Sequence, residues 1–305
     1  MHGKNGSTLY CGLSLSLSIL FIPDPILSIL PRILEIMDAL HMEQPGTGWS
    51  LRPVSWILCP SMRIAIDTHT HSVASGHAYS TVDELARGVR SRGLEGFVLT
   101  DHGPALPGGA HPYHFGNIRI LPRIIEGVRF YRGIEANILD LQGRIDLEPY
   151  WIGYLDFVMA GVHEACFTSR GETENTLALI AALENPLVDA ISHPGNPAFP
   201  IDFMAVVDRA AALGKALEVN DSSFRVRKGS SENCLALARA CAEADCPVVC
   251  GSDAHYWADA GRLDTAVETL LAAGVSEEQV VNARTDRFEA FVARRRAEKG
   301  FSQAS

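Results

Sequence analysis

Asp67-Thr68-His69-Thr70-His71 follows the short apolar run at residues 63–66, and the two together predict a β-strand and its polar end. Successive side chains on a strand point to opposite faces, so positions 67, 69 and 71 would project from the same side. Two imidazoles and a carboxylate on one face would make up a large part of a metal site. A His-x-His pair also occurs by chance on exposed strands, so the rest of the chain has to separate a metal site from a surface pattern.

The bulk composition is typical of a soluble globular protein and limits its partners. The chain has 305 residues, of which 47% are hydrophobic and 20% charged. This length can hold two domains, but a single α/β barrel also reaches it. The formal net charge of −10 argues against a surface for duplex nucleic acid, which needs clustered Lys and Arg, but leaves a small anionic substrate open. Seven scattered Cys without a CxxC pair are typical of reduced thiols in the cytoplasm.

Residues 1–61 differ in composition from the rest of the chain. The apolar segment at 9–22 is shorter than the ~20 residues of a membrane span. It resembles a signal-peptide core but has no clean cleavage site. Three interpretations remain open for this extension: an export or anchor segment, a disordered extension, and a start codon assigned too far upstream. Met62 directly precedes the first predicted strand, so we favour the third and expect one domain at 62–305. We expect this domain to be cytoplasmic and to have no membrane segment, with export or anchoring as the alternative.

From Met62 onward, short apolar runs alternate with segments of helical periodicity. The strands are predicted at 63–67, 96–100, 130–134, 156–161, 187–192, 216–219 and 247–251, and the main helices at 80–91, 172–183, 201–213, 231–244 and 261–273. A turn-rich loop at 103–128 leads to a shorter helix. This alternation predicts parallel strands joined by right-handed crossovers, in an α/β fold.

Polar residues of metal-binding or catalytic type lie at the end of every predicted strand. Of the 11 His, seven lie at or just after a strand end, two lie in 1–61 and two lie in the loop 103–128. In a β/α barrel the C-terminal strand ends converge on the face that carries the active site. An open sheet would spread these groups too widely to share one site. The distribution therefore predicts a closed or nearly closed barrel with a metal centre at the C-terminal ends of its strands.

Nine side chains are candidate metal ligands: His69, His71, His77, His102, Glu135, His163, His193, Asp253 and His255. At three or four protein ligands per ion, nine suit two or three metals. The two carboxylates could bridge cations in a multi-metal clamp for phosphoryl transfer. His77 alone would fit a surface loop, but it is close enough to His71 in sequence to fold back over the site. We interpret Asp67 and Asp101 as partners that orient imidazoles, with direct ligation as the alternative.

Several separated motifs resemble the PHP (polymerase and histidinol phosphatase) family. Its opening motifs are similar to Thr68-His69-Thr70-His71 with Ser75 and His77, and to Thr100-Asp101-His102-Gly103. Residues 132–137, 193–197 and 251–255 resemble its YcdX-type branch, and the likeness extends from about 62 to 290. The resemblance implies a distorted (β/α)7 barrel with phosphatase activity and a trinuclear site, usually of zinc and sometimes of manganese or iron.

The resemblance also implies how the nine side chains divide among the ions. By position, His69, His71, Glu135 and Asp253 would hold one metal. Glu135 would bridge to a second metal held by His163 and His193. The third metal would be held by His77, His102 and His255.

These patterns predict a hydrolase that cleaves the phosphate ester of a small substrate at three divalent ions, zinc first among the candidates. A metal-bound hydroxide would attack, so no side chain is assigned as the nucleophile. The basic turn at 225–229 offers Arg227 and Lys228 to the substrate phosphate, or is simply solvated. An amidohydrolase or deaminase remains open, although no Lys ends a predicted strand, as does phosphodiesterase or exonuclease-like action on nucleotide ends. The sequence is compatible with a homo-oligomer.

Overall fold

The computed structural model of the protein describes residues 62–301. The extension proposed at 1–61 lies outside the described residues. Among residues 62–301, no helix is both long enough and apolar enough to cross a membrane. The cytoplasmic location stays a prediction.

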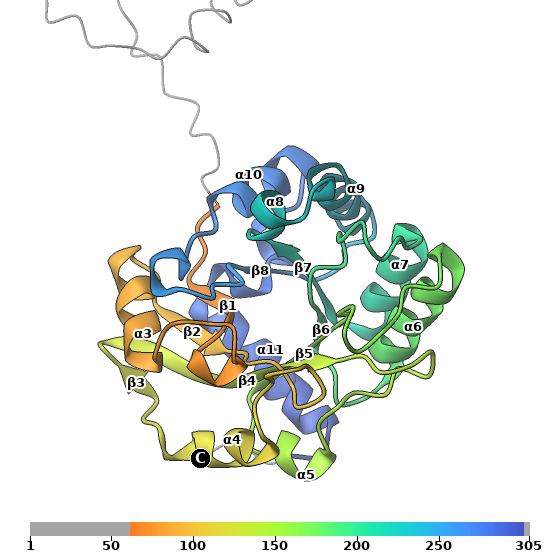
Figure 1. Ribbon diagram of the computed structural model, residues 1–305. Helices are drawn as coiled ribbons and strands as arrows, with labels where there is room; N and C mark the ends of the chain where they lie inside the picture. The colour runs from red at the N-terminus through yellow and green to blue at the C-terminus, as the bar shows by residue number, and fades with distance from the viewer. Residues whose placement is uncertain (1–61, 302–305) are drawn as a thin grey trace, which may run out of the picture. The chain divides into compact units, whose positions relative to one another are not determined.

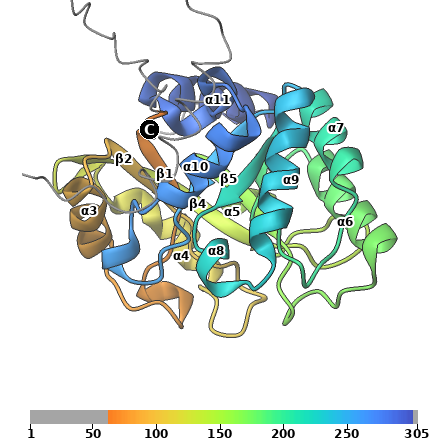
Figure 2. The same cartoon turned by 90° about the horizontal axis from the view of Figure 1, so that it is seen from above.

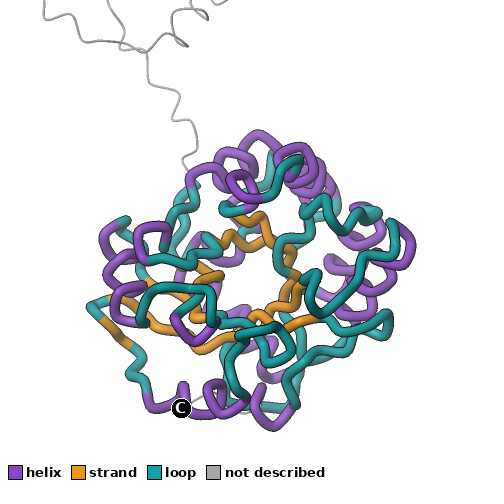
Figure 3. The backbone as a smooth tube through the Cα atoms, viewed as in Figure 1, coloured by secondary structure: helices purple, strands orange, loops and turns teal. Residues whose placement is uncertain are grey.

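Parallel strands follow one another in chain order around a barrel, with helices on its outside (Figures 1 and 3). The strands are β1 (Ile66–Thr70), β2 (Gly96–Leu99), β4 (Val128–Asn137), β5 (Phe157–Gly161), β6 (Ala190–Ile191), β7 (Ala216–Asn220) and β8 (Val248–Gly251). The short β3 (Ile124–Ile125) pairs antiparallel with the start of β4. The predicted α/β barrel fold is confirmed.

The barrel closes between its first strand and the loop after its last strand. Thr70 and Ala254 form a parallel bridge. Beside it, the backbone N–H of Asp253 donates to the carbonyl of His69 (2.8 Å), and that of His71 donates to the carbonyl of Ala254 (2.9 Å). The two chain segments that meet here each carry candidate ligands.

Helices surround the strands, as the alternating pattern predicts. The longer ones are α3 (Val82–Ser91), α6 (Glu172–Glu184), α7 (Phe203–Leu213), α9 (Ser230–Glu243) and α10 (Asp264–Ala273). The shorter ones are α4 (Pro112–Asn117), α5 (Pro149–Ile152) and α8 (Ser223–Val226), together with the 3-10 turns η1 (Val73–Ser75), η2 (Ile118–Ile120), η3 (Trp257–Asp259), η4 (Glu277–Gln279) and η5 (Val281–Ala283). The helices bury the outer face of the sheet, which is why its strands are apolar almost throughout.

Two helix starts show how local sequence fixes these elements. Thr81 caps α3 and forms a capping box with Glu84, because each side chain accepts the backbone N–H of the other residue. The α10 helix has no cap of its own, and the carboxylate of Asp221, at the end of β7, accepts from the backbone N–H of Thr265 (2.9 Å). A residue from the C-terminal face therefore anchors α10.

The C-terminal helix α11 (Thr285–Glu298), which the sequence pattern did not predict, lies across the end of the barrel where the strands begin (Figures 1 and 2). Phe288, Phe291 and Val292 pack in one core cluster with the first residues of several strands, such as Ile66 and Phe157. This helix closes the end of the barrel opposite to the candidate ligands.

Most strands differ from their predicted bounds by one to four residues, with the strand predicted at 187–192 reduced to Ala190–Ile191, and two strands extend three residues past their predicted ends. The first strand begins at Ile66 and includes Asp67–Thr70, and the third strand continues through Glu135 to Asn137. In both, the sequence pattern predicts that the strand ends at its polar residues. Backbone pairing continues through these polar residues, with Glu135 opposite Met159 and Asn137 opposite Gly161. Their side chains are buried at a site that offers polar partners, so polarity does not end the strand here.

Candidate metal centre

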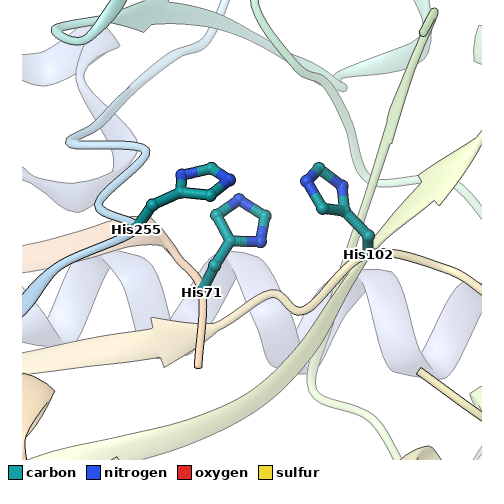
Figure 4. A group of neighbouring side chains, drawn as sticks. All are labelled: His71, His102 and His255. Atoms are coloured by element: carbon teal, nitrogen blue, oxygen red, sulfur yellow. The ribbon is translucent and has the colours of Figure 1, made fainter. Parts of the chain in front are cut away.

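The nine candidate ligands gather at the C-terminal face of the barrel. Glu135 lies in β4 and His69 in β1, and the others follow β1, β2, β5, β6 and β8. Figure 4 shows three of them, His71, His102 and His255, with their rings turned toward one another. The strand-end pattern predicts this gathering at one face, and the ligation of a metal by these residues stays a prediction.

The carboxylate of Glu135 lies at the centre of the group. Each of its oxygens faces imidazole nitrogens at 2.8–3.6 Å. The nitrogens belong to His69, His71 and His102 at Oε2, and to His163 and His193 at Oε1. In a tetrahedral zinc site with bonds of about 2.0–2.1 Å, two donor atoms lie roughly 3.3 Å apart. The observed spacing is therefore that of atoms able to share an ion.

Asp253 forms a second carboxylate contact. Its Oδ1 lies 3.6 Å from Nε2 of His69 and 3.3 Å from Nε2 of His71. Asp253 and His193 both have a positive φ, 52° and 34°, which is uncommon for residues other than glycine. Such strain persists where surrounding contacts impose it, and it concentrates at functional sites.

The remaining imidazoles form a more open group. The Nε2 atoms of His77 and His255 are 3.0 Å apart, and the ring of His102 lies with its centre 5.0 Å from that of His77 and 5.7 Å from that of His255. His77 therefore does fold back over the site from the turn after η1.

Several buried atoms of this cluster have no hydrogen-bond partner among residues 62–301. They include the Nε2 atoms of His69, His71, His163 and His193, Nδ1 of His102 and Oε2 of Glu135, and Nδ1 of His193 on the far side of its ring also has no partner. Buried polar atoms are nearly always paired, because leaving one unpaired costs ~1–3 kcal/mol. Six such atoms on converging side chains fit a site built for cations.

Four of the imidazoles are oriented by acceptors at their other nitrogen. Nδ1 of His69 lies 2.8 Å from Oε1 of Glu218, and Nδ1 of His163 lies 2.7 Å from Oδ1 of Asn137. Nδ1 of His255 lies 3.0 Å from the carbonyl of Asp253, and Nδ1 of His71 lies 3.3 Å from Oγ of Ser75. A carboxylate, amide oxygen or carbonyl can only accept, so the contacts of His69, His163 and His255 assign a proton to Nδ1, and Nε2 is then the nitrogen available to a cation. This is how metal-binding histidines are held.

Sequence reasoning did not assign Glu218, Asn137 and Asp146 to the site. Glu218 also accepts the backbone N–H of His193 (2.7 Å), and Asp146 holds Asn137 at its backbone and side-chain nitrogens. A glycine at 251 permits the Glu218 contact, since a Cβ there would lie 2.2 Å from Oε1 of Glu218. The feature of the sequence that could have indicated Glu218 and Asn137 is their position at the ends of predicted strands.

Asp67 and Asp101 are fully buried, but neither forms a hydrogen bond to the ring of a candidate ligand. Asp67 accepts from the backbone N–H of His69, Ser252 and Gly261, so it holds the loop after β8 behind the cluster. Asp101 accepts from Ser72 and Ser75. The contact that orients the ring of His69 is made by Glu218, in the role that we expected of Asp67.

The charges of the cluster shift its pKa values in opposite directions. Burial would raise the pKa of Glu135, but the surrounding imidazoles, His69 first, hold it well below its usual range. Burial would lower the pKa of His69, but the carboxylates of Glu218, Glu135 and Asp253 raise it well above its usual range. Burial, helped by His102 and His255, lowers the pKa of His71. Both carboxylates of the cluster are thus ionised, since the pKa of Asp253 is also held low by His69 against the effect of burial.

Arg227 reaches the edge of the cluster. Its Nη2 donates to Oδ2 of Asp253 (3.2 Å), and its Nη1 donates to Oγ of Ser223 (2.9 Å) and Oδ1 of Asn220 (3.3 Å). Beside it, a pocket of about 600 Å³ is lined by residues including His163, His193, Phe199, Arg227 and Lys228. Lys228 is exposed at this pocket.

Known proteins resemble the chain in sequence and in fold. No protein-family model matches it. It is 45% identical over 235 residues to a probable phosphatase of Acetivibrio thermocellus, over 77% of this chain and 98% of that protein. It is 47% identical over 222 residues to a probable phosphatase of Shewanella amazonensis, over 72% of this chain and 88% of that protein. The crystal structure of histidinol phosphate phosphatase from Lactococcus lactis, complexed with zinc, L-histidinol and phosphate, aligns with a TM-score of 0.52 at 18% identity, over 70% of this chain and 94% of that chain.

The closed barrel and the imidazole–carboxylate cluster at its C-terminal face define a β/α-barrel protein with a candidate active site where such barrels carry theirs. The chain belongs to the family of these probable phosphatases, which are hydrolases of phosphoric esters, and the PHP resemblance of its motifs is supported by the fold. Its assignment to the YcdX-type branch stays a prediction.

Proposed function

We propose that the protein is a metal-dependent phosphatase that holds three divalent ions, zinc first among the candidates, and hydrolyses a small phosphomonoester. The observation that carries this proposal is the convergence of six buried nitrogen and oxygen atoms that have no hydrogen-bond partner among residues 62–301. The phosphatase relatives support the ester as substrate, and the donor set of imidazole and carboxylate suits zinc, manganese and iron.

Three overlapping sets of residues would hold the ions. His69, His71 and Asp253, whose ligand atoms all lie within 4.8 Å of one another, form the first set together with Oε2 of Glu135. Oε1 of Glu135, with His163 and His193, forms the second set. His77, His102 and His255 form the third set. His102 also lies 2.9 Å from Glu135, so it stands where the sets meet.

When bound, divalent ions supply an activated water near neutral pH and neutralise charge on the phosphoryl oxygens. The protein's own side chains bind and orient. Glu218 and Asn137 fix the rings of His69 and His163, and Glu135 spans two sets because its oxygens face opposite groups. The low pKa of Glu135 keeps this carboxylate ionised and ready to ligate across the neutral pH range.

Arg227 is suited to hold the substrate phosphate. The three hydrogen bonds to Asp253, Ser223 and Asn220 fix the guanidinium, which has five N–H donors in all. Two donors remain for phosphoryl oxygens, and a rigid fork matches their geometry. The adjacent pocket of about 600 Å³ has the size of small-molecule sites and would take the alcohol part of the ester.

A thiol nucleophile does not fit this site. The thiol of Cys234 packs against Gly195, next to the site, and burial raises its pKa to about 12, so it stays protonated at neutral pH. Thiolate, and not thiol, is the nucleophilic form of cysteine. The five cysteines among residues 62–301 are all free, as expected for reduced thiols.

The test combines metal analysis with turnover on one purified sample. We expect close to three ions per chain and hydrolysis of p-nitrophenyl phosphate and other phosphomonoesters, with little action on bis(p-nitrophenyl) phosphate or on amide substrates. His69→Ala combined with His193→Ala should abolish turnover, and His111→Ala, which changes an exposed histidine outside the cluster, should preserve it. Turnover that survives the double substitution, or one ion per chain with amide hydrolysis, would overturn the proposal.

A further inference from the structure

His114 lies on α4, outside the nine-residue cluster, yet its ring reaches toward the site. Its Nε2 lies 3.0 Å from Oδ2 of Asp101, which is fully buried, whereas the side chain of His114 is 27% exposed. We propose that His114 is a positioning residue of the metal centre, acting through Asp101 on the turn that carries His71 and His77. This inference rests on the proposed metal-dependent function.

The first step of the argument is that one carboxylate holds both ends of a turn. Asp101 accepts from the backbone N–H and the hydroxyl of Ser72 (2.7 and 2.8 Å) and from the hydroxyl of Ser75 (2.7 Å). Ser72 caps the start of η1, and Ser75 is its last residue. His77 follows two residues later and donates its backbone N–H to the carbonyl of Ser75 (2.9 Å). The position of Asp101 therefore sets the position of η1 and of the histidine after it.

The second step links Asp101 to the rings of the cluster. Because the hydroxyl of Ser75 donates to Asp101, its oxygen is left to accept. It lies 3.1 Å from the backbone nitrogen of His102 and 3.3 Å from Nδ1 of His71. Nδ1–H of His71 therefore donates to this oxygen, and its Nε2 faces Asp253, 3.3 Å away. The tautomer and orientation of a proposed ligand thus depend on where Asp101 lies.

The third step is that His114 is the partner of Asp101 from a different part of the fold. The hydrogen bonds to this carboxylate come from Ser72 and Ser75, on the turn that it positions, whereas His114 faces it as an ion-pair partner. A carboxylate held only by that turn could shift together with it. His114 comes from α4 and ties the carboxylate to the barrel wall, since the neighbouring Phe115 is buried in the core cluster. The contact with His114 therefore holds the carboxylate of Asp101 in place relative to the barrel.

A structural role of His114 in α4 alone would leave metal binding unchanged, so metal affinity is the decisive measurement. Zinc affinity and stoichiometry of the full chain are measured by competition with a chromophoric chelator. Loss of a group that directly orients a metal ligand typically weakens metal binding by roughly 10–100-fold, and because His114 acts through Asp101 and Ser75 we expect a loss of about 10-fold for His114→Ala at one or more ions. His114→Gln should rescue much of the loss, since its amide can donate to Asp101.

His111→Ala is the matched control on the same helix. Nδ1 of His111 accepts the backbone N–H of Tyr113 and caps α4, without touching Asp101. It should bind zinc like the wild type even if the thermal midpoint falls. Zinc binding by His114→Ala that matches His111→Ala would overturn the inference.

Ser75→Ala tests the route without changing α4, and it serves if His114→Ala folds poorly. It should weaken zinc binding in the same way, and wild-type affinity in this variant would overturn the proposed route. A wild-type chain that binds no zinc and hydrolyses no phosphomonoester would instead overturn the proposed function, before any variant is compared.

Discussion

Nδ1 of His69 lies 2.8 Å from Oε1 of Glu218, and both side chains are fully shielded from solvent. Glu218 accepts in addition from the backbone N–H of His193, so one carboxylate from β7 holds two residues of the cluster. The contact pins the ring of His69 with its Nε2 toward Glu135. The cluster therefore depends on a layer of acceptors behind it as much as on the nine side chains themselves.

Glu218→Gln should weaken zinc binding and lower kcat, each by roughly 10–100-fold. The amide would turn one acceptor oxygen into a donor, which then faces either Nδ1–H of His69 or the backbone N–H of His193. Zinc titration and steady-state kinetics measure the two effects. Glu289→Gln, in an exposed pair with Arg129, is the control and should behave like the wild type. Equal zinc affinity in the two variants would contradict this role of Glu218.

Glu135→Gln should remove more than one ion per chain, because Glu135 faces two groups of imidazoles. Since a bound ion contributes several kcal/mol to transition-state stabilisation, kcat should fall by roughly 10³-fold or more. Mass spectrometric metal analysis gives the stoichiometry. Glu164→Gln changes an exposed carboxylate beside His163 at the pocket and should keep the full complement of ions. A loss of one ion only would argue against bridging by Glu135.

Arg227→Lys should lower kcat/KM by about 10–150-fold, the equivalent of one charge-assisted hydrogen bond of ~1.5–3 kcal/mol. Lysine cannot present a planar fork to phosphate. Inhibition by inorganic phosphate should weaken in parallel, because phosphate would bind through the same contact. Metal content has to stay at the wild-type level for this interpretation, since Arg227 also contacts Asp253. Lys228→Ala, at the exposed rim, should have a smaller effect.

Phe288→Ala should destabilise the barrel without changing metal affinity. Phe288 is fully buried on α11 and packs with its ring centre 5.0 Å from that of Tyr131 and 5.7 Å from that of Phe157. Removing a buried phenyl ring costs about 3–5 kcal/mol. Urea unfolding measures this loss as a lower midpoint. Zinc binding that weakens as strongly as stability falls would show that the closed end of the barrel is coupled to the site.

The barrel fold and the gathering of the candidate ligands could be predicted from the sequence alone, because both follow from the alternation of strands and helices. Parallel strands end on one face, so polar residues at strand ends such as His69 and His193 had to meet there. Glu218 also sits near a strand end, but which of Glu218, Asn220 and Asp221 turns toward a histidine depends on strand twist, which residue order does not reveal. The α11 helix was missed because Phe288, Phe291 and Val292 form a narrow stripe among many charges, and because Arg295 is buried through an ion pair with Asp189.

The barrel closes between Thr70 and Ala254, so the candidate site is completed by segments that are synthesised at very different times. Asp67 and Ser252, which hydrogen-bond beside this seam, are 185 residues apart in the sequence. During synthesis, His69 and His71 leave the ribosome long before Asp253 and His255 exist to face them. Contacts this distant in sequence slow folding, because closing a long loop costs conformational entropy. A nascent chain without β8 would leave β1 as an open edge, the kind of edge that recruits other chains. The two halves of the candidate metal centre therefore meet only after the last strand has been made and placed beside the first.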